Sequence, residues 1–159
     1  MEQDVVIRSA RPGDMPAVAA AYEWLFVPPG QRPPQWDEAD AVRVLHEVSS
    51  SDRSDVLIAD ADGNPVGFCT VYLDILSVRF GQRSWVEDLA VHPDRRSQGV
   101  GRRLLTAAQD WARRHGATHL ELDSGNDAHE HTGSTKAGNR HRAHNASAGP
   151  SDRGCFRLP

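Results

Sequence analysis

Hydrophobic and polar positions follow two different periods along the chain, and each change of period marks a predicted element. Short apolar or alternating runs predict strands at residues 5–8, 56–60, 66–76, 85–91 and 118–123. Apolar residues at helical spacing predict helices from residue 15 or 16 to about 25, from 37 to about 48, and from 100 to 114. The predicted order is therefore β-α-α-β-β-β-α-β.

Turn and capping residues set the boundaries of these elements. Asp14 is placed to cap the first helix, and Asp37 is placed to start the second. The proline-rich segment 26–36 cannot continue a helix. Asp62-Gly63-Asn64-Pro65 is a hairpin signal, and Gly81-Gln82 predicts the turn into the following strand.

The stretch from Trp85 to Leu105 carries the strongest chemical signal in the chain. It runs from a strand through a loop with arginines and glycines into a helix. A helix start has unpaired amides and a partial positive charge, and Gly99 and Gly101 let an anion approach the backbone closely. Four arginines (Arg95, Arg96, Arg102 and Arg103) add donors suited to phosphates. The order of elements favours a phosphate site over a solvated basic turn.

One motif in this stretch carries a resemblance to a known family. Arg96-x-x-Gly99-x-Gly101, preceded by Leu89-Ala90-Val91-His92-Pro93, resembles the acetyl-coenzyme A signature of the GNAT N-acetyltransferase superfamily. The resemblance covers residues 5–123. It implies an α/β (α+β) fold with a central mixed, mostly antiparallel sheet flanked by helices. It also implies acetyl-CoA as the cofactor and a small-molecule or peptide amine as the acceptor.

The same resemblance assigns the residues that would hold acetyl-CoA. The backbone of the loop and helix start would bind the pyrophosphate, and the end of the preceding strand would hold the pantetheine arm. One amide of that strand would point at the thioester carbonyl. The expected cofactor-binding residues are Leu89, Ala90, Val91, Arg96, Gln98, Gly99, Val100, Gly101, Arg102 and Arg103.

For the base that takes the amine proton, the resemblance points to Glu87 first and Asp88 second. As neighbours on a strand they are expected on opposite faces, so at most one would face the cleft. The alternative is that both are solvated or capping carboxylates. No residue of the sequence offers itself as the general acid.

The acceptor site is expected to be lined from two directions. In a fold of this family, the segment between the first two helices overhangs the acceptor, which would place Trp24, Phe26 and Trp36 there. A plain connector is the alternative for that segment. Tyr72 and Asp74, on the neighbouring strand, are expected to line the same site, with ordinary strand packing as the alternative for Tyr72.

Composition narrows the classes of partner and location. The formal net charge is −4 and the pI is about 6.0, which argues against a general nucleic-acid binder. Residues 1–123 hold 13 Arg, no Lys and 19 acidic residues, and this acidic body favours cationic acceptors. The start of the chain is no signal peptide, and no apolar run is long enough for a membrane. Two cysteines form no disulfide framework, so a cytoplasmic location is expected.

The segment 124–159 departs from the family pattern, and we predict a core at 1–123 followed by a low-complexity, disordered tail. From Ser124 to Gly154 there is no Val, Ile, Leu, Met, Phe, Trp or Tyr, so little apolar burial can offset the entropy of ordering. The last helix and hairpin of the family are therefore expected to be missing. The four tail histidines (His129, His131, His141 and His144) lack acidic or thiol partners at a ligand spacing, so no metal site is expected.

A reading-frame shift after Glu130 would explain the tail, since the slipped frame can restore a helix start with its tyrosine; a natural low-complexity tail is the alternative. Sequencing the gene past Glu130 decides between them. Without a hairpin partner, the strand at 118–123 would present an open edge. Such an edge predicts marginal stability, and it offers a place where a second copy of the chain could pair to form a homodimer.

The sequence therefore favours an acetyl-CoA-dependent N-acetyltransferase whose activity is impaired by its tail. Two alternatives stay open. One is a catalytically inactive coenzyme A-binding or interaction protein. The other is an α/β domain whose glycine loop binds a different phosphate compound.

Overall fold

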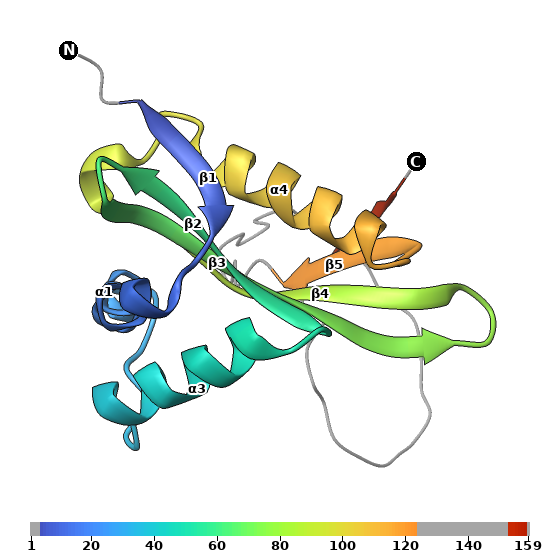
Figure 1. Ribbon diagram of the computed structural model, residues 1–159, viewed down its shortest axis with the longest axis horizontal. Helices are drawn as coiled ribbons and strands as arrows, with labels where there is room; N and C mark the ends of the chain where they lie inside the picture. Colours follow the sequence, from blue (N-terminus) through green and yellow to red (C-terminus); the bar gives the residue numbers. More distant parts are fainter. Residues whose placement is uncertain (1–3, 124–152, 159) are drawn as a thin grey trace, which may run out of the picture.

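A computed structural model describes residues 4–123 and 153–158, apart from the side chains of 153–157. The elements in chain order are β1 (Val5–Ser9), η1 (Pro12–Asp14), α1 (Met15–Ala21), α2 (Glu23–Phe26), α3 (Glu38–Ser50), β2 (Ser54–Ala61), β3 (Asn64–Ser77), β4 (Gly81–Val91), η2 (Pro93–Arg95), α4 (Val100–Arg114), β5 (His119–Asp123) and β6 (Arg153–Arg157). The predicted class and order are confirmed, since a mixed sheet is flanked by helices on both faces (Figure 1).

The sheet has six strands in the order β1-β2-β3-β4-β5-β6. Every neighbouring pair is antiparallel except β4 and β5, which are parallel. A parallel pair requires a crossover connection, and α4 supplies it on one face of the sheet. α1 and α3 cover the opposite face (Figure 1). The predicted mostly antiparallel topology is therefore the observed one.

Two apolar cores lie on the two faces of this sheet. α4 buries Val100, Leu104, Ala108, Trp111 and Ala112, the helical stripe that the sequence predicts. The second core lies under α1 and α3 and contains the buried side chains of Met15, Val18, Leu45, Ile58 and Phe68. Because β2 and β3 are covered on both faces, they form the rigid centre on which β4 is held.

The first predicted helix is divided. The structure breaks it at Tyr22 into α1 and α2, where one helix from residue 15 to about 25 was expected. Asp14 makes no side-chain cap; its carboxylate instead pairs with Arg8, 2.7 Å from Nη1, and accepts the Arg11 amide. The ion pair with Arg8 therefore takes the place of the predicted helix cap. Asp37 caps α3 as predicted, with its side chain accepting the Asp40 amide at 2.8 Å.

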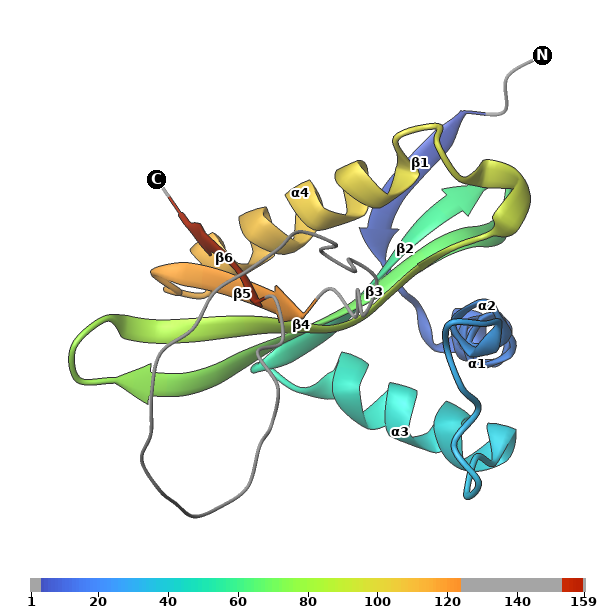
Figure 2. The ribbon, with the colours of Figure 1, turned by 180° about the vertical axis from the view of Figure 1, so that it is seen from behind.

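The β3–β4 hairpin is longer than the sequence pattern suggests. Gly81-Gln82 was expected to form the turn, but the strand already begins at Gly81. Gly81 has φ +80°, and a Cβ there would lie 2.8 Å from Thr118 Cγ2, so the backbone packs directly on the start of β5. The hairpin projects from the end of the sheet away from α1 and α2 (Figure 2).

The far edge of the sheet differs from the prediction. The strand at 118–123 was expected to have an open edge, but β6 pairs antiparallel with β5 over all five residues. That part of the expected tail is therefore a strand, and the expectation that β5 has an open edge is wrong. Marginal stability and a homodimer stay predictions. The expected disorder, the missing helix, the frameshift segment and the four histidines fall in 124–152, outside the described residues. Among the helices that the structure describes, none is long and apolar enough to cross a bilayer.

Candidate active site

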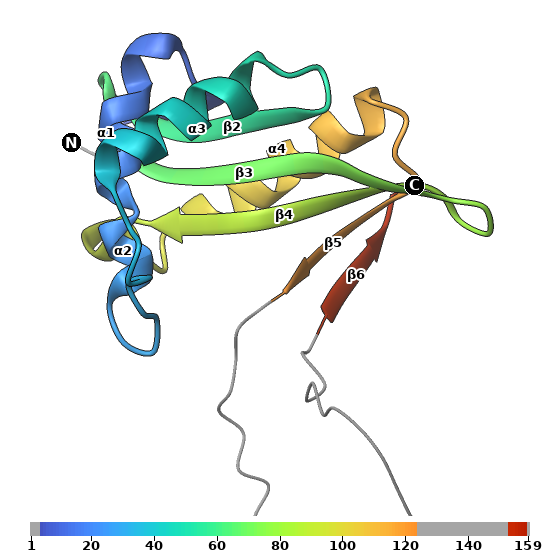
Figure 3. The ribbon, with the colours of Figure 1, turned by 90° about the horizontal axis from the view of Figure 1, so that it is seen from below.

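A cleft opens where β4 leaves β5. The two strands pair in parallel only from Arg83–His119 to Val86–Leu122, and they diverge beyond that point (Figure 3). Residues 87–91 of β4 therefore have no ladder partner on that side within the described chain. The cleft has a volume of about 610 Å³ and is lined by residues of β4, α4, α2 and β5: Leu25, Val86, Glu87, Asp88, Leu89, Gly101, Arg102, Leu105, Leu122 and Asp123.

A β-bulge lies in β4 at the mouth of this cleft. Cys69 pairs with Leu89 and Val71 pairs with Val86, so Thr70 alone faces both Glu87 and Asp88. Two residues of one strand against one of its partner is the definition of a bulge. The amide of Asp88 donates to Thr70 Oγ1 at 3.1 Å. A side chain of β3 therefore contacts the backbone of the bulge.

The bulge turns Glu87 and Asp88 toward the same face, which corrects the prediction that they lie on opposite faces. Glu87 accepts a hydrogen bond from the Trp85 indole, and Trp85 pairs with Tyr72 on the face that α1 and α3 occupy. Asp88 meets Thr70, two residues from Tyr72 and on the same face of β3. Strand alternation fails here because the extra residue resets it.

Asp88 is enclosed by hydroxyl groups. Its Oδ2 accepts from Tyr22 Oη at 2.7 Å and from Thr70 Oγ1 at 3.5 Å. Burial raises the pKa of this carboxyl above its ordinary value, while the Tyr22 hydrogen bond acts in the opposite direction. Burial, followed by the nearby Asp88 charge, also raises the pKa of Tyr22. Tyr22 therefore stays protonated and serves as a fixed donor to Asp88.

Glu87 is exposed and stands between two cavities. It lines the cleft beside β5, and it also lines a second cavity of about 560 Å³ with Tyr72, Leu73, Asp74, Arg83 and Trp85. No other described residue of β4 lines both. A base at this position can reach a group in either cavity.

The backbone alternation of β4 directs particular amides into the cleft. The His92 amide donates to Val66 O of β3 at 2.9 Å, and the Asp88 amide also points toward β3. Because peptide groups alternate along a strand, the amides of Leu89 and Val91 point away from β3, toward the cleft. Their partner strand has already departed, so these donors face a ligand space.

The start of α4 closes the other end of the cleft. Gly99 is the N-cap residue with φ +80° and no side-chain cap, and Ser97 also has a positive φ of 62°. The first helical hydrogen bond runs from the Arg103 amide to Gly99 O, so the amides of residues 100–102 precede any intrahelical acceptor. Such a helix start in a left-handed turn is suited to an anion.

The basic and polar side chains of this loop have different roles. Arg102 is exposed and lines the cleft. Arg96 braces the loop against α2, with Nη2 3.4 Å from Trp24 O, and Gln98 closes the loop on Asp94 O at 3.0 Å. Arg103 differs from the prediction: its guanidinium donates to Val5 O of β1 at 2.6 Å, and its amide is engaged within the helix. Arg103 therefore ties α4 to the sheet.

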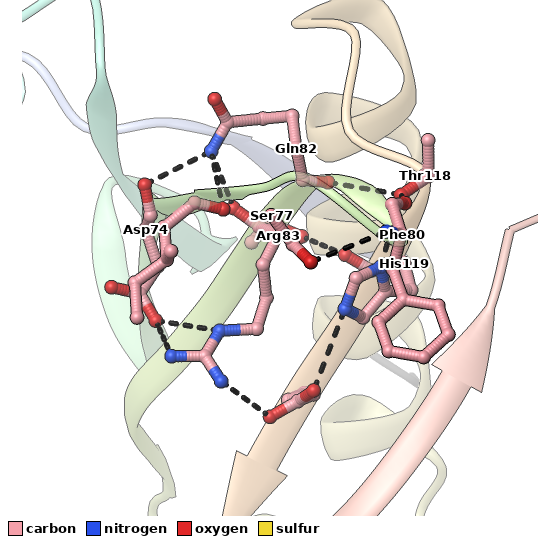
Figure 4. Close-up of polar contacts among 10 residues, drawn as sticks. Asp74, Ser77, Phe80, Gln82, Arg83, Thr118 and His119 are labelled. Carbon is pink, nitrogen blue, oxygen red and sulfur yellow. Dashed lines mark hydrogen bonds and ion pairs between the residues drawn. The ribbon is translucent and has the colours of Figure 1, made fainter.

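Beside the second cavity, an ion-pair network joins the β3–β4 hairpin to β5. Arg83 Nε lies 2.8 Å from Asp74 Oδ2, and Arg83 Nη1 lies 3.3 Å from Glu121 Oε2 (Figure 4). His119 Nε2 lies 3.5 Å from the other oxygen of Glu121. Tyr72 and Asp74, both predicted for the acceptor, do line this cavity. Arg83 and Trp85 join them without having been expected.

Of the three predicted aromatic residues of the segment between the first helices, Phe26 and Trp36 stay together and Trp24 lies apart. Trp36 stacks beside Tyr22, with ring centroids 5.1 Å apart, and lines a third cavity of about 270 Å³ that also touches Tyr72. Phe26 packs edge-on against Trp36 at 4.8 Å. Trp24 instead packs on His92 at 5.1 Å, beside the glycine loop. Only Trp36 therefore lines a cavity next to the predicted strand residues.

Sequence reasoning missed Tyr22 and Thr70, which complete the site. Tyr22 sits at the break between α1 and α2, and Thr70 reads as an ordinary strand residue. Thr70 is 1% exposed, and a buried hydroxyl must find a partner. No local signal identifies that partner, because it lies 18 residues further along the chain.

Comparison with known proteins places this geometry in a family. Residues 16–132 match the model of the acetyltransferase (GNAT) family. The uncharacterized N-acetyltransferase YhfO of Bacillus subtilis is 39% identical over 72 residues, which cover 45% of this chain and 48% of that protein. The chain thus matches about half the length of this relative.

Two further proteins match over a greater length. An aminoglycoside N(6')-acetyltransferase type 1 of Stenotrophomonas maltophilia is 33% identical over 123 residues, 74% of each chain. The crystal structure of aminoglycoside N-acetyltransferase AAC(6')-Iy in complex with CoA superposes with a TM-score of 0.68 at 20% identity, covering 80% of this chain and 81% of that one. With the family match extending over most of the described core, the chain belongs to the acetyltransferase (GNAT) family.

Proposed function

We propose that this protein is an N-acetyltransferase that transfers the acetyl group of acetyl-CoA to a small-molecule amine. The observation that carries the proposal is the shared wall at Glu87. One side of this wall is a cleft with free backbone donors, and the other is a cavity with aromatic and acidic lining. A transferase of this kind must hold two substrates on either side of one reacting bond.

The donor cleft fits a diphosphate at one end and a thioester at the other. The amides of Val100, Gly101 and Arg102 at the α4 start are suited to the pyrophosphate, with the Arg102 side chain beside them. A Cβ at Gly101 would lie 3.6 Å from Val91 Cγ2, so the fold itself leaves room there. The strand amide of Leu89 supports the thioester end, since it points into the cleft.

The acceptor cavity suits a cationic amine. Asp74 and Glu87 outnumber the single Arg83 among the charged residues that line it, and Tyr72 and Trp85 supply aromatic surface. The related aminoglycoside N(6')-acetyltransferase, whose acceptor class is a small-molecule amine, supports the same choice. The cavity on the Trp36 side of Tyr72 extends the acceptor wall toward α3.

Glu87 is proposed as the base. The acceptor nitrogen attacks the thioester carbonyl carbon, a C–N bond forms, the C–S bond breaks with sulfur leaving as thiolate, and Glu87 receives the nitrogen proton. Its exposure keeps it in contact with water, through which the proton can pass. The Leu89 amide would stabilise negative charge on the carbonyl oxygen. Asp88 is less suited to this role because Tyr22 and Thr70 already occupy its outer oxygen.

The experiment is a calorimetric titration with acetyl-CoA, paired with thiol release over a panel of amines. The expected result is saturable binding together with thiol release that depends on both acetyl-CoA and an amine. Binding without thiol release would favour a catalytically inactive coenzyme A-binding protein, which is also the outcome expected if the segment 124–152 has impaired activity. No heat of binding would refute the proposal at its first step.

A further inference from the structure

We infer that Thr70 and Tyr22 are positioning residues of the acyl-transfer site, and that they hold the β4 bulge in the register that aims the Leu89 amide into the donor cleft. The inference rests on the proposed function. It extends that function to Thr70 on β3, which lines none of the three cavities, and to Tyr22 at the α1–α2 junction, which lines the third cavity beside Trp36.

The amide of Asp88 makes the first contact that holds the bulge. The extra residue in β4 disrupts the regular ladder at this position. Thr70 Oγ1 accepts the amide at 3.1 Å. Thr70 is 1% exposed, so water cannot substitute for the hydroxyl. A methyl in its place would leave a buried amide unpaired, and the bulge would relax toward a regular ladder.

The carboxylate of Asp88 makes the second contact that holds the bulge. Tyr22 Oη donates to Asp88 Oδ2 at 2.7 Å. Tyr22 lies between α1 and α2, in the helix layer that covers this face of the sheet. The Tyr22 ring is itself fixed, with its centroid 4.7 Å from that of Phe68 and 5.1 Å from that of Trp36. The bulge is thus anchored from the strand beside it and from the helix layer above it.

The bulge also determines which strand amide faces the cleft. Peptide alternation along β4 makes the direction of the Leu89 amide a consequence of the direction of the Asp88 amide. If the bulge were lost, this part of β4 would shift by one residue against β3, and the Leu89 amide would point toward β3. The hydroxyl of Thr70 therefore controls which strand amide faces the thioester carbonyl, although Thr70 lines none of the three cavities described above.

The test compares Thr70→Val with Thr70→Ser, which keeps the hydroxyl and loses only the methyl. Thr70→Val is expected to lower kcat by roughly 10²–10³-fold, the range for losing one oxyanion donor. The Kd for coenzyme A should change less than about threefold, because the α4 amides are untouched. Thr70→Ser should recover most of kcat. A Thr70→Val protein with wild-type kcat, or an equal loss in both variants, overturns the inference.

A second variant and a second readout keep the test independent of activity. Tyr22→Phe preserves the ring contacts and removes only the donor, so it should lower kcat with little change in Tm. Amide hydrogen exchange of Asp88, followed by NMR, should be faster in Thr70→Val and normal in Thr70→Ser. Unchanged exchange in Thr70→Val refutes the inference even if the wild-type protein releases no thiol, whereas absent thiol release alone would count only against the proposed function.

Discussion

The most direct test of the donor cleft is the substitution Gly101→Ala. In the structure a Cβ at this position would meet Val91 Cγ2 at 3.6 Å and Leu89 Cδ2 at 3.7 Å, which are ordinary van der Waals distances. The residue lies in the first turn of α4 and has no positive φ. Alanine should therefore fit the protein and, by its better helix propensity, stabilise it by about 0.5–1 kcal/mol.

The ligand is where the added methyl should be felt. The Cβ would project toward the side chains of Leu89 and Val91, and Gly101 and Leu89 both line the cleft. Displacing a phosphate from one charged hydrogen bond costs about 1.5–3 kcal/mol. At 1.4 kcal/mol per tenfold, the Kd for acetyl-CoA should rise by roughly 10- to 100-fold. The structure thus predicts opposite signs for stability and affinity.

The assay is thermal unfolding together with calorimetric titration of acetyl-CoA. Tm should rise by a few degrees, about what such a gain implies for a domain of this size, while affinity falls. Gly13→Ala is the matched control, because a Cβ there meets nothing within 4 Å and the residue lies in η1, outside the residues that line the cleft. Gly101→Ala with wild-type affinity would mean that no phosphate approaches this backbone, and would favour a different ligand for the loop.

Three further outcomes follow from the same geometry. Glu87→Gln should lower kcat by roughly 10²–10⁴-fold with Tm unchanged, since the side chain is exposed; an unaltered pH–rate profile would exclude it as the base. Burial raises the pKa of Asp88, so its contribution to stability is greatest below its ordinary pKa and is lost as pH rises through the raised value. Asp88→Asn should therefore gain stability relative to wild type as the pH rises above the ordinary pKa of an aspartate, and a urea-unfolding difference independent of pH contradicts this. Gly67→Ala should lose about 1–3 kcal/mol, because its Cβ would lie 3.0 Å from Leu104 Cδ1 and 3.1 Å from Ala90 O; a urea midpoint equal to wild type would show that α4 can shift without cost.

Most of the fold could be predicted from the sequence because its determinants are local. The α4 stripe, the Asp37 cap and the hairpin at residues 62–65 each depend on residues a few positions apart. The glycine loop is local in the same sense, since Gly99 must adopt φ +80° immediately before a helix. Short-range spacing therefore sufficed for these elements and for the glycine turn at the start of α4.

The element boundaries and the strand pair that the sequence did not predict have a different origin. At the break between α1 and α2, Tyr22 packs against Phe68, and at the early start of β4, Gly81 lies against Thr118; both partners lie far along the chain. The same holds for the edge of the sheet, where β6 pairs with β5 across a long stretch of sequence. The hydrophobic period of the sequence does not indicate such pairings. A period depends on the residues of one element, whereas pairing depends on two elements.

The shared face of Glu87 and Asp88 was decided by the tertiary structure alone. Alternation along an isolated strand puts Glu87 and Asp88 on opposite faces, and only the pairing of two β4 residues with Thr70 brings both to one face. Tyr22 reaches Asp88 across 66 positions of sequence. Local chemistry thus determined that α4 starts after a left-handed glycine, with uncapped amides suited to a phosphate. The direction of the groups that face it depends on a bulge, and a bulge is a property of two strands whose hydrogen bonds must all find partners.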